Sequence, residues 1–144
     1  MESRSRKRSA VHFPHGADIG IRGIGPTRAA AFEQAALALT SVVTEVRKVH
    51  PADEITICCE ADDDRILLAD WLNALIYDMA VNHRLFGRFQ VSLDGPRLLG
   101  RAWGERIDPS RHALTVEPKG ATFTAIEVAR RPDGSWVAQC VVDV

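Results

Sequence analysis

Apolar residues recur along the chain with two different periods, which divide it into predicted strands and helices. Isoleucine alternates with small or charged residues over 19–24, and this predicts a strand with one buried face. Apolar residues then recur every three or four positions over 27–45, where Thr27 is a candidate N-cap. The same helical period produces a clean apolar stripe over 63–82. The pattern therefore predicts a strand followed by two amphipathic helices.

Further candidate strands flank the helices. A short one is expected over 11–13, where Pro14 breaks it, and another over 54–60. From Leu85 onward the pattern changes to strands joined by short turns, at 89–93, 97–104, 115–128 and 136–142, and Pro118 and Gly120 interrupt the third of these. Because each helix has one apolar stripe, we expect both to cover one face of a largely antiparallel or mixed sheet. The sequence thus predicts an α+β, two-layer domain.

Composition adds a charged tail to this picture. The 144 residues are 46% hydrophobic and 26% charged, as in an ordinary folded domain. Residues 1–10 carry little to bury, and we expect a disordered basic tail followed by a single domain over 11–144. The alternative role for the tail is a salt-sensitive contact with RNA or another acidic surface. Its basic side chains are Arg4, Arg6, Lys7 and Arg8.

Charge, hydropathy and cysteine content exclude several broad classes of protein. The net charge of −1 does not indicate a nucleic-acid binder. No apolar run approaches the roughly 20 residues of a membrane helix, and the first residues lack the hydrophobic region of a secretory signal. Cys58, Cys59 and Cys140 are odd in number and have no metal-binding spacing. We therefore expect a cytoplasmic protein with reduced thiols and no membrane partner.

The sequence contains no recognisable catalytic motif. The glycines of 20–25 have the wrong offsets for a dinucleotide fingerprint, and HExxH, CxxC and GxSxG do not occur. His50, His83 and His112 fall in predicted loops or at a helix end, where surface histidines are common, and no nucleophile–base pair is found. The acidic run 62–64 precedes a helix, so capping and the helix dipole explain it without a metal. We therefore predict no catalytic residue.

Acidic positions near the two ends of the chain are candidates for a metal site. Asp18 follows a glycine-containing turn at the entrance of a predicted strand, while Asp143 and Val144 end the sequence after an apolar strand. The Asp143 carboxylate and the main-chain carboxylate of Val144 need counter-charge if this strand is buried. Hard cations such as Ca²⁺ or Mg²⁺ bind such oxygens. Two alternatives stay open: Asp18 bonds its own turn, or the last residues fray into water.

The run His15-Gly16-Ala17-Asp18-Ile19-Gly20-Ile21 resembles the His-Thr-Ala-Asp-hydrophobic-Gly signature of the archease family. Further segments that are similar to this family occur in the same order, at 30–39, 71–77, 102–105, 117–123 and 142–144. The resemblance therefore covers about 11–144. Archeases are small, non-enzymatic cofactor proteins of the RtcB-type RNA ligase of tRNA splicing and RNA repair. They are thought to promote guanylylation of the ligase and its multiple turnover.

The resemblance implies a divalent metal ion, Ca²⁺ or Mg²⁺ with Mn²⁺ as a further candidate, held by Asp18, Asp143 and Val144. It also implies that RNA is met only through the ligase. Pro14 and Gly16 depart from the family pattern, which has an acid and a threonine there. Other matching polar residues could contribute to activation, or equally form turn bonds and surface ion pairs: His15, Glu105 and Lys119.

Two other function classes are alternatives to a ligase activator. A metal-dependent hydrolase would need a general base and a richer set of ligands, which the sequence does not clearly supply. A general chaperone or RNA-binding module would act through broad contacts, in part through the basic tail. The sequence predicts no oligomeric state.

Overall fold

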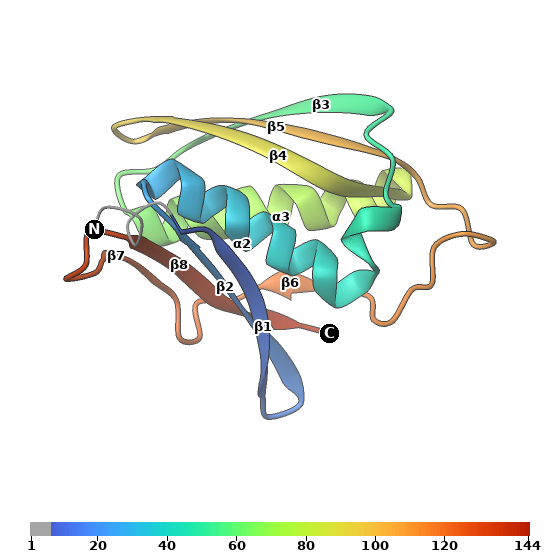
Figure 1. Ribbon diagram of the computed structural model, residues 1–144, viewed down its shortest axis with the longest axis horizontal. Coiled ribbons are helices and arrows are strands. Elements are labelled where there is room, and N and C mark those ends of the chain that lie inside the picture. Colours follow the sequence, from blue (N-terminus) through green and yellow to red (C-terminus); the bar gives the residue numbers. More distant parts are fainter. Residues whose placement is uncertain (1–6) are drawn as a thin grey trace.

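The computed structural model describes residues 7–144, and two helices lie between two antiparallel sheets (Figure 1). One sheet has the order β1–β2–β8–β6, with β7 also paired to β8, and the other has the order β3–β5–β4. The first sheet consists of β1 (Ser9–His15), β2 (Asp18–Gly25), β6 (Gly120–Ala121), β7 (Glu127–Arg130) and β8 (Trp136–Asp143). The second consists of β3 (Asp53–Glu60), β4 (Arg84–Asp94) and β5 (Arg97–Arg106). The helices are α2 (Arg28–Val43), the short 3-10 helix η1 (Val46–Lys48) and α3 (Asp64–Asn82).

Both predicted helices are confirmed, and their first turns are capped as expected. The Thr27 side chain accepts a hydrogen bond from the backbone N–H of Ala30 at 3.0 Å. The Asp63 carboxylate accepts one from the N–H of Arg65 at 2.8 Å. Asp64 forms an ion pair with Arg28 at 2.6 Å, which ties the start of α3 to the start of α2. Capping and pairing thus account for the last two acids of the run 62–64.

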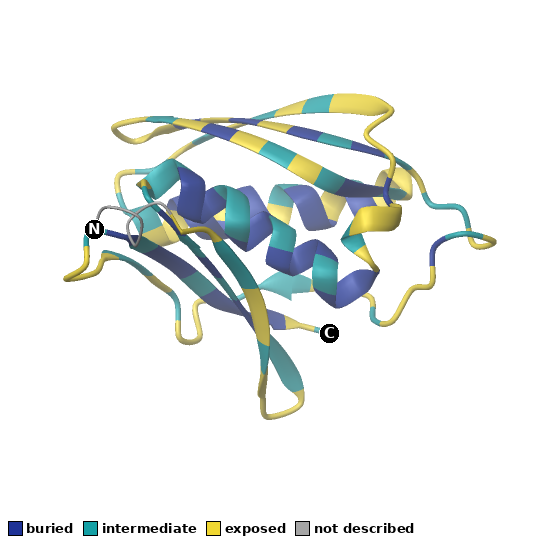
Figure 2. Cartoon of the chain, viewed as in Figure 1, coloured by how far each residue is buried: buried dark blue, intermediate teal, exposed yellow. Residues whose placement is uncertain are grey.

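The α+β class with antiparallel pairing is also confirmed, but the strands form two sheets instead of one. As a result α2 contacts β1, β2 and β8 on one side and β4 on the other, while α3 contacts strands of both sheets. Small side chains allow this close approach, since the Cα of Gly23 in β2 lies against the backbone of Ala31 and Ala35 in α2. The two helices therefore form the middle layer of the molecule, in which α2 has no exposed residue and α3 keeps one face exposed (Figure 2).

Two expectations about strand extent are wrong. The predicted strand over 115–128 is mostly irregular and contains only β6 and the start of β7, because Pro118 cannot donate to a ladder and Ala125 has φ +53°. In contrast, β1 continues through Pro14, which an edge strand tolerates. Residues 1–6 of the predicted basic tail lie outside the described residues, whereas Ser9 and Ala10 begin β1.

The core is one cluster of apolar side chains centred on the two helices. Trp71, predicted to be a core residue, is fully buried. Cys58 is exposed, Cys59 is half-buried and Cys140 is buried, and all three are free thiols. No helix within 7–144 is long and apolar enough to cross a membrane.

Candidate functional site

The candidate site begins at the β1–β2 hairpin, whose tip projects from the body of the molecule (Figure 1). His15 is paired with Asp18 across the turn, and Gly16 supplies the left-handed conformation there, with φ +60°. Gly20 serves a different purpose. A Cβ atom at Gly20 would lie 2.1 Å from the ring of Phe13, so the glycine makes room for a side chain of β1.

The pairing of β2 with β8 brings the two ends of the sequence together. Ile19 is aligned with Val142, and extending this register by one residue aligns Asp18 with Asp143. Directly opposed residues of an antiparallel pair lie about 5 Å apart. On its other side, the carbonyl oxygen of Asp143 accepts a hydrogen bond from the N–H of Lys119 at 2.8 Å. The backbone of β8 is therefore held on both sides as far as Asp143.

The two carboxylates at this end of the sheet are without protein partners. Asp18 is half-buried and Asp143 is exposed, and neither carboxylate has a hydrogen bond or ion pair with any residue of 7–144. Asp18 thus does not bond its own turn. No group of three His, Cys, Asp or Glu side chains suited to a metal occurs in the described chain. An ion here would have two carboxylates and the main-chain oxygens of Val144, an all-oxygen set that suits a hard divalent cation.

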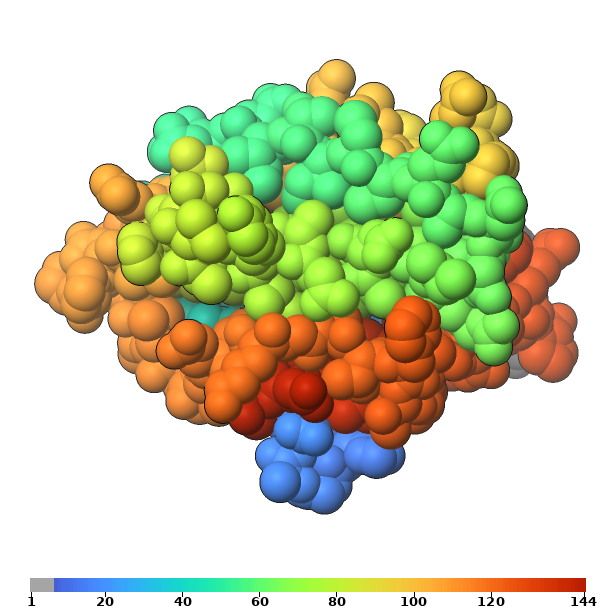
Figure 3. Space-filling view, turned by 180° about the vertical axis from the view of Figure 1, so that it is seen from behind, coloured from blue at the N-terminus to red at the C-terminus, as the bar shows by residue number. Residues whose placement is uncertain are grey.

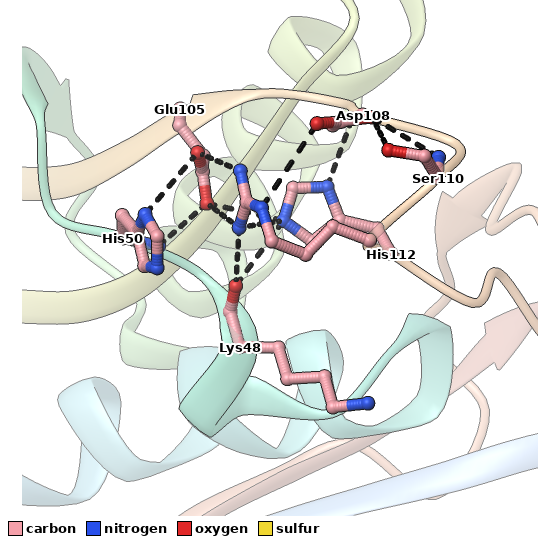
Figure 4. Close-up of polar contacts among 7 residues, drawn as sticks. Lys48, His50, Glu105, Asp108, Ser110 and His112 are labelled. Carbon is pink, nitrogen blue, oxygen red and sulfur yellow. Dashed lines mark hydrogen bonds and ion pairs between the residues drawn. The ribbon is translucent and has the colours of Figure 1, made fainter.

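A second polar cluster, which the sequence did not predict, surrounds Glu105 at the end of β5 (Figure 4). Arg111 donates from Nη2 to Glu105 Oε1 at 2.6 Å and from Nη1 to Oε2 at 2.8 Å. The backbone N–H of His50 donates to Glu105 Oε2 at 2.6 Å. His112 Nε2 lies 3.1 Å from the same oxygen. Glu105 is therefore part of an ion-pair network, one of the two roles expected for it.

His112 corrects the expectation of a surface histidine. Only 2% of the residue is exposed, because the loop after β5 folds back on η1 and buries the ring. Local sequence pattern does not reveal this burial, since the loop is irregular and its partners lie near residues 48 and 105. The one feature of the sequence that could have indicated this cluster is the short spacing between Glu105 and the adjacent residues Arg111 and His112.

The pKa of Glu105 is lowered to about 2, chiefly by the hydrogen bonds from Arg111 and against the opposing effect of burial. Because the folded-state pKa lies below the unfolded value of about 4.5, the carboxylate contributes stability above that value. The contribution is lost as the pH falls through about 4.5 towards 2.

Replacing Glu105 with glutamine is therefore expected to lower the free energy of unfolding by about 1–3 kcal/mol at neutral pH. The difference from wild type should shrink as the pH falls below about 4.5, since wild-type Glu105 then also loses its charge. Urea denaturation over this pH range measures both quantities. The control is Glu60→Gln, at an exposed carboxylate on β3. A Glu105→Gln deficit that does not change with pH would contradict the electrostatic explanation.

Comparison with protein-family models finds that residues 11–144 match the Archease protein family (MTH1598/TM1083). The chain is 42% identical over 137 residues to protein archease of Pyrococcus furiosus, which covers 92% of this chain and 96% of that protein. It is 32% identical over 147 residues to protein archease of Methanosarcina barkeri, covering 97% of this chain and 99% of that protein.

Solved structures show the same similarity. The solution structure of protein 1598 of Methanobacterium thermoautotrophicum has a TM-score of 0.80 and 30% sequence identity, and covers 94% of this chain and 99% of that chain. The crystal structure of an archease of Thermotoga maritima, described as a possible chaperone, has a TM-score of 0.65 and covers 92% of this chain and 94% of that chain. With 17% identity, the second likeness concerns the fold alone.

Proposed function

Because the chain belongs to the Archease protein family, we propose that it is a non-enzymatic, metal-binding activator of an RtcB-type RNA ligase. In this role it promotes guanylylation of the ligase and its turnover in tRNA splicing or RNA repair. The protein acts in the cytoplasm and meets RNA only through the ligase. The role of ligase activator comes from the family resemblance, and the chemistry of Asp18 and Asp143 supports it.

The observation that carries the proposal is the pair of carboxylates, Asp18 and Asp143, left without protein partners at one end of the β2–β8 ladder. Two unpaired carboxylates on adjacent strands repel each other, and this repulsion is relieved when a cation binds between them. We propose that Asp18, Asp143 and the main-chain oxygens of Val144 hold a divalent ion, Ca²⁺ or Mg²⁺ with Mn²⁺ as a further candidate. Such an ion supplies positive charge that can bind phosphate oxygens of a nucleotide.

The protein's own residues determine where the carboxylates are presented. Gly16 closes the hairpin that carries Asp18, and the hydrogen bond from Lys119 fixes the backbone at Asp143. The hairpin tip projects from the body of the molecule (Figure 3), so this end of the sheet can approach a cleft in a partner. Pro14 and Gly16 bring no carboxylate or hydroxyl beside the site. Its charge therefore comes from Asp18, Asp143 and any main-chain carboxylate of Val144.

Ligase guanylylation with and without this protein tests the proposal. We expect Asp18→Asn and Asp143→Asn each to lower the stimulated rate by about 10-fold or more, since each removes one of two charged ligands. Asp94→Asn, at an exposed carboxylate of the β4–β5 turn, is the matched control and should stimulate like wild type. Calorimetric titration with Ca²⁺, Mg²⁺ and Mn²⁺ should show a parallel loss of binding in the first two variants.

Three results would contradict the proposal in different ways. Full stimulation by both variants would exclude the carboxylate pair as the functional site. Turnover of a phosphodiester by the purified protein alone would favour a metal-dependent hydrolase. Protection of unrelated proteins from aggregation, without any effect on guanylylation, would favour a general chaperone.

A further inference from the structure

The segment 107–119, called the strap here, connects β5 to β6 without regular secondary structure and forms one wall of a cavity of about 440 Å³. The opposite wall consists of apolar side chains of α2 and α3, among them Val43, Ile76 and Met79. Figure 3 shows this hollow between the end of α3 and the strap. One wall of this open hollow is therefore an irregular segment, which is held by apolar packing of Ile107 and Val116 and by hydrogen bonds.

Four anchors hold the strap against the rest of the fold. Near its ends, the N–H of Ile107 donates to the carbonyl oxygen of His83, and that of Lys119 to Asp143, both at 2.8 Å. In its second half, the N–H of Thr115 donates to Val43 at 2.8 Å. The fourth anchor joins the strap to η1 and β5 through the polar cluster of Figure 4, and it is the one with a titratable group at its centre.

The hydrogen bonds around His112 assign its protonation state. Its Nδ1 atom accepts a hydrogen bond from the backbone N–H of Asp108 at 2.9 Å, so Nδ1 carries no proton. Its Nε2 atom lies near two acceptors, Glu105 Oε2 at 3.1 Å and the carbonyl oxygen of Lys48 at 3.2 Å, and also 3.1 Å from the donor Nη1 of Arg111, so the bond at Nδ1 decides the tautomer. The proton must therefore reside on Nε2, and the folded strap requires a neutral imidazole in this one tautomer.

Protonation of His112 conflicts with these contacts. A proton on Nδ1 would point at the N–H of Asp108, which turns a hydrogen bond into a clash between two donors. It would also place a second cation beside Arg111, whose Nη1 lies 3.1 Å from Nε2. The negative charge of Glu105 favours the protonated form of His112, but Arg111 already donates a hydrogen bond to each of the two carboxylate oxygens.

The carboxylates of Glu105 and Asp108 both attract a charged imidazole, but neither removes the clash of two donors at Nδ1. The Asp108 carboxylate also accepts two hydrogen bonds from Ser110 and lies 3.9 Å from Arg111. The ammonium group of Lys48 points away from the cluster towards Glu45. The ring of His50 lies 3.9 Å from Glu105 and is an additional titratable neighbour.

We propose that protonation of His112 releases the strap from η1 and exposes more of the apolar wall of the cavity beside it. The groups around His112 belong to β5, η1 and the strap, and none of them is a proposed metal ligand. The N–H of Asp108 is the direct reporter, because its hydrogen bond depends on the unprotonated Nδ1 atom.

Nuclear magnetic resonance on the intact protein tests the proposal. Long-range proton–nitrogen spectra at about pH 7.5 should show the Nε2–H tautomer for His112. As this imidazole titrates, the exchange protection of the Asp108 amide should fall about tenfold or more, and protection in the rest of the strap should follow. Amides in the middle of α3 should stay protected. Binding of the dye anilinonaphthalene sulfonate should rise over the same pH range as the cavity opens.

His112→Asn keeps an acceptor near the position of Nδ1 but cannot gain a proton, so strap protection should no longer depend on pH in this variant. His83→Asn changes an exposed histidine that lines the cavity and should keep the wild-type pH dependence. If His112→Asn does not fold, the wild-type spectra decide alone. Any of four results would overturn the proposal. They are an Nδ1–H tautomer, unchanged amide protection through the titration, an imidazole that stays neutral until α3 unfolds, and no rise in dye binding.

Discussion

Replacing Trp71 with alanine is expected to lower the free energy of unfolding by about 3–5 kcal/mol. Trp71 is fully buried at the point where both helices meet the three-stranded sheet. Its Nε1 donates to the carbonyl oxygen of Phe32 in α2 at 3.1 Å, and its ring packs edge-on against Phe89 with centroids 6.1 Å apart. The ring also fills the space beside Gly100, where a Cβ atom would come within 2.3 Å of it. The alanine variant therefore loses packing on three sides and leaves a cavity.

Chemical denaturation of Trp71→Ala measures this loss, and two variants of the same helix separate its causes. Trp71→Phe keeps an aromatic ring but removes the hydrogen bond to Phe32, so we expect a smaller loss of about 1–3 kcal/mol. Tyr77→Ala changes an aromatic side chain that is 65% exposed and should alter stability by only about 0.5 kcal/mol. If Trp71→Ala cost no more than Tyr77→Ala, the assignment of Trp71 to the core would be wrong.

Replacing Gly23 with alanine is expected to cost about 3 kcal/mol or more and to disturb the candidate site as well. A Cβ atom at this position would lie 2.2 Å from the backbone nitrogen of Ala35 and 2.3 Å from the carbonyl oxygen of Ala31. Both atoms belong to the backbone of α2 and cannot rotate away. The variant must therefore move β2 from the helix, and Asp18 lies on the same strand.

Denaturation and metal titration of Gly23→Ala test the two parts of this prediction separately. The matched control is Gly120→Ala in β6, where the nearest atom to an added Cβ lies at 3.6 Å, an ordinary contact distance. We expect the control to keep nearly wild-type stability. Gly23→Ala with wild-type stability would show that β2 and α2 are not packed as closely as described.

Several elements could be predicted from the sequence because their causes are local. The helices follow from a period of three to four residues that continues over several turns, and their starts follow from Thr27 and Asp63 as capping residues. The β4–β5 hairpin is likewise marked by alternation on either side of a turn, and the strand at the end of the sequence by an apolar run that follows a turn. Asp18 and Asp143 are also candidate ligands from the sequence, where the resemblance to a family favours them, and their metal binding stays a prediction.

Other features depend on residues that are distant in sequence. Periodicity does not tell how strands are shared between sheets, and α2, which contacts strands of both sheets, has no exposed residue to mark an outer face. The irregular strap and the burial of His112 depend on contacts with Lys48 and Glu105. No local pattern records contacts of this kind, and the prediction of a surface histidine was wrong for that reason.

The sequence by itself thus determined the helices, most of the strands, the absence of known catalytic motifs and the candidate residues Asp18, Asp143 and Val144. Only the tertiary structure decided that the strands form two sheets, that Asp18 and Asp143 lie at the same end of the β2–β8 ladder, and that His112 anchors the strap. The physical reason is the range of the forces involved. Propensity and capping act within one or two turns of chain, whereas register and burial depend on which distant segments pack together.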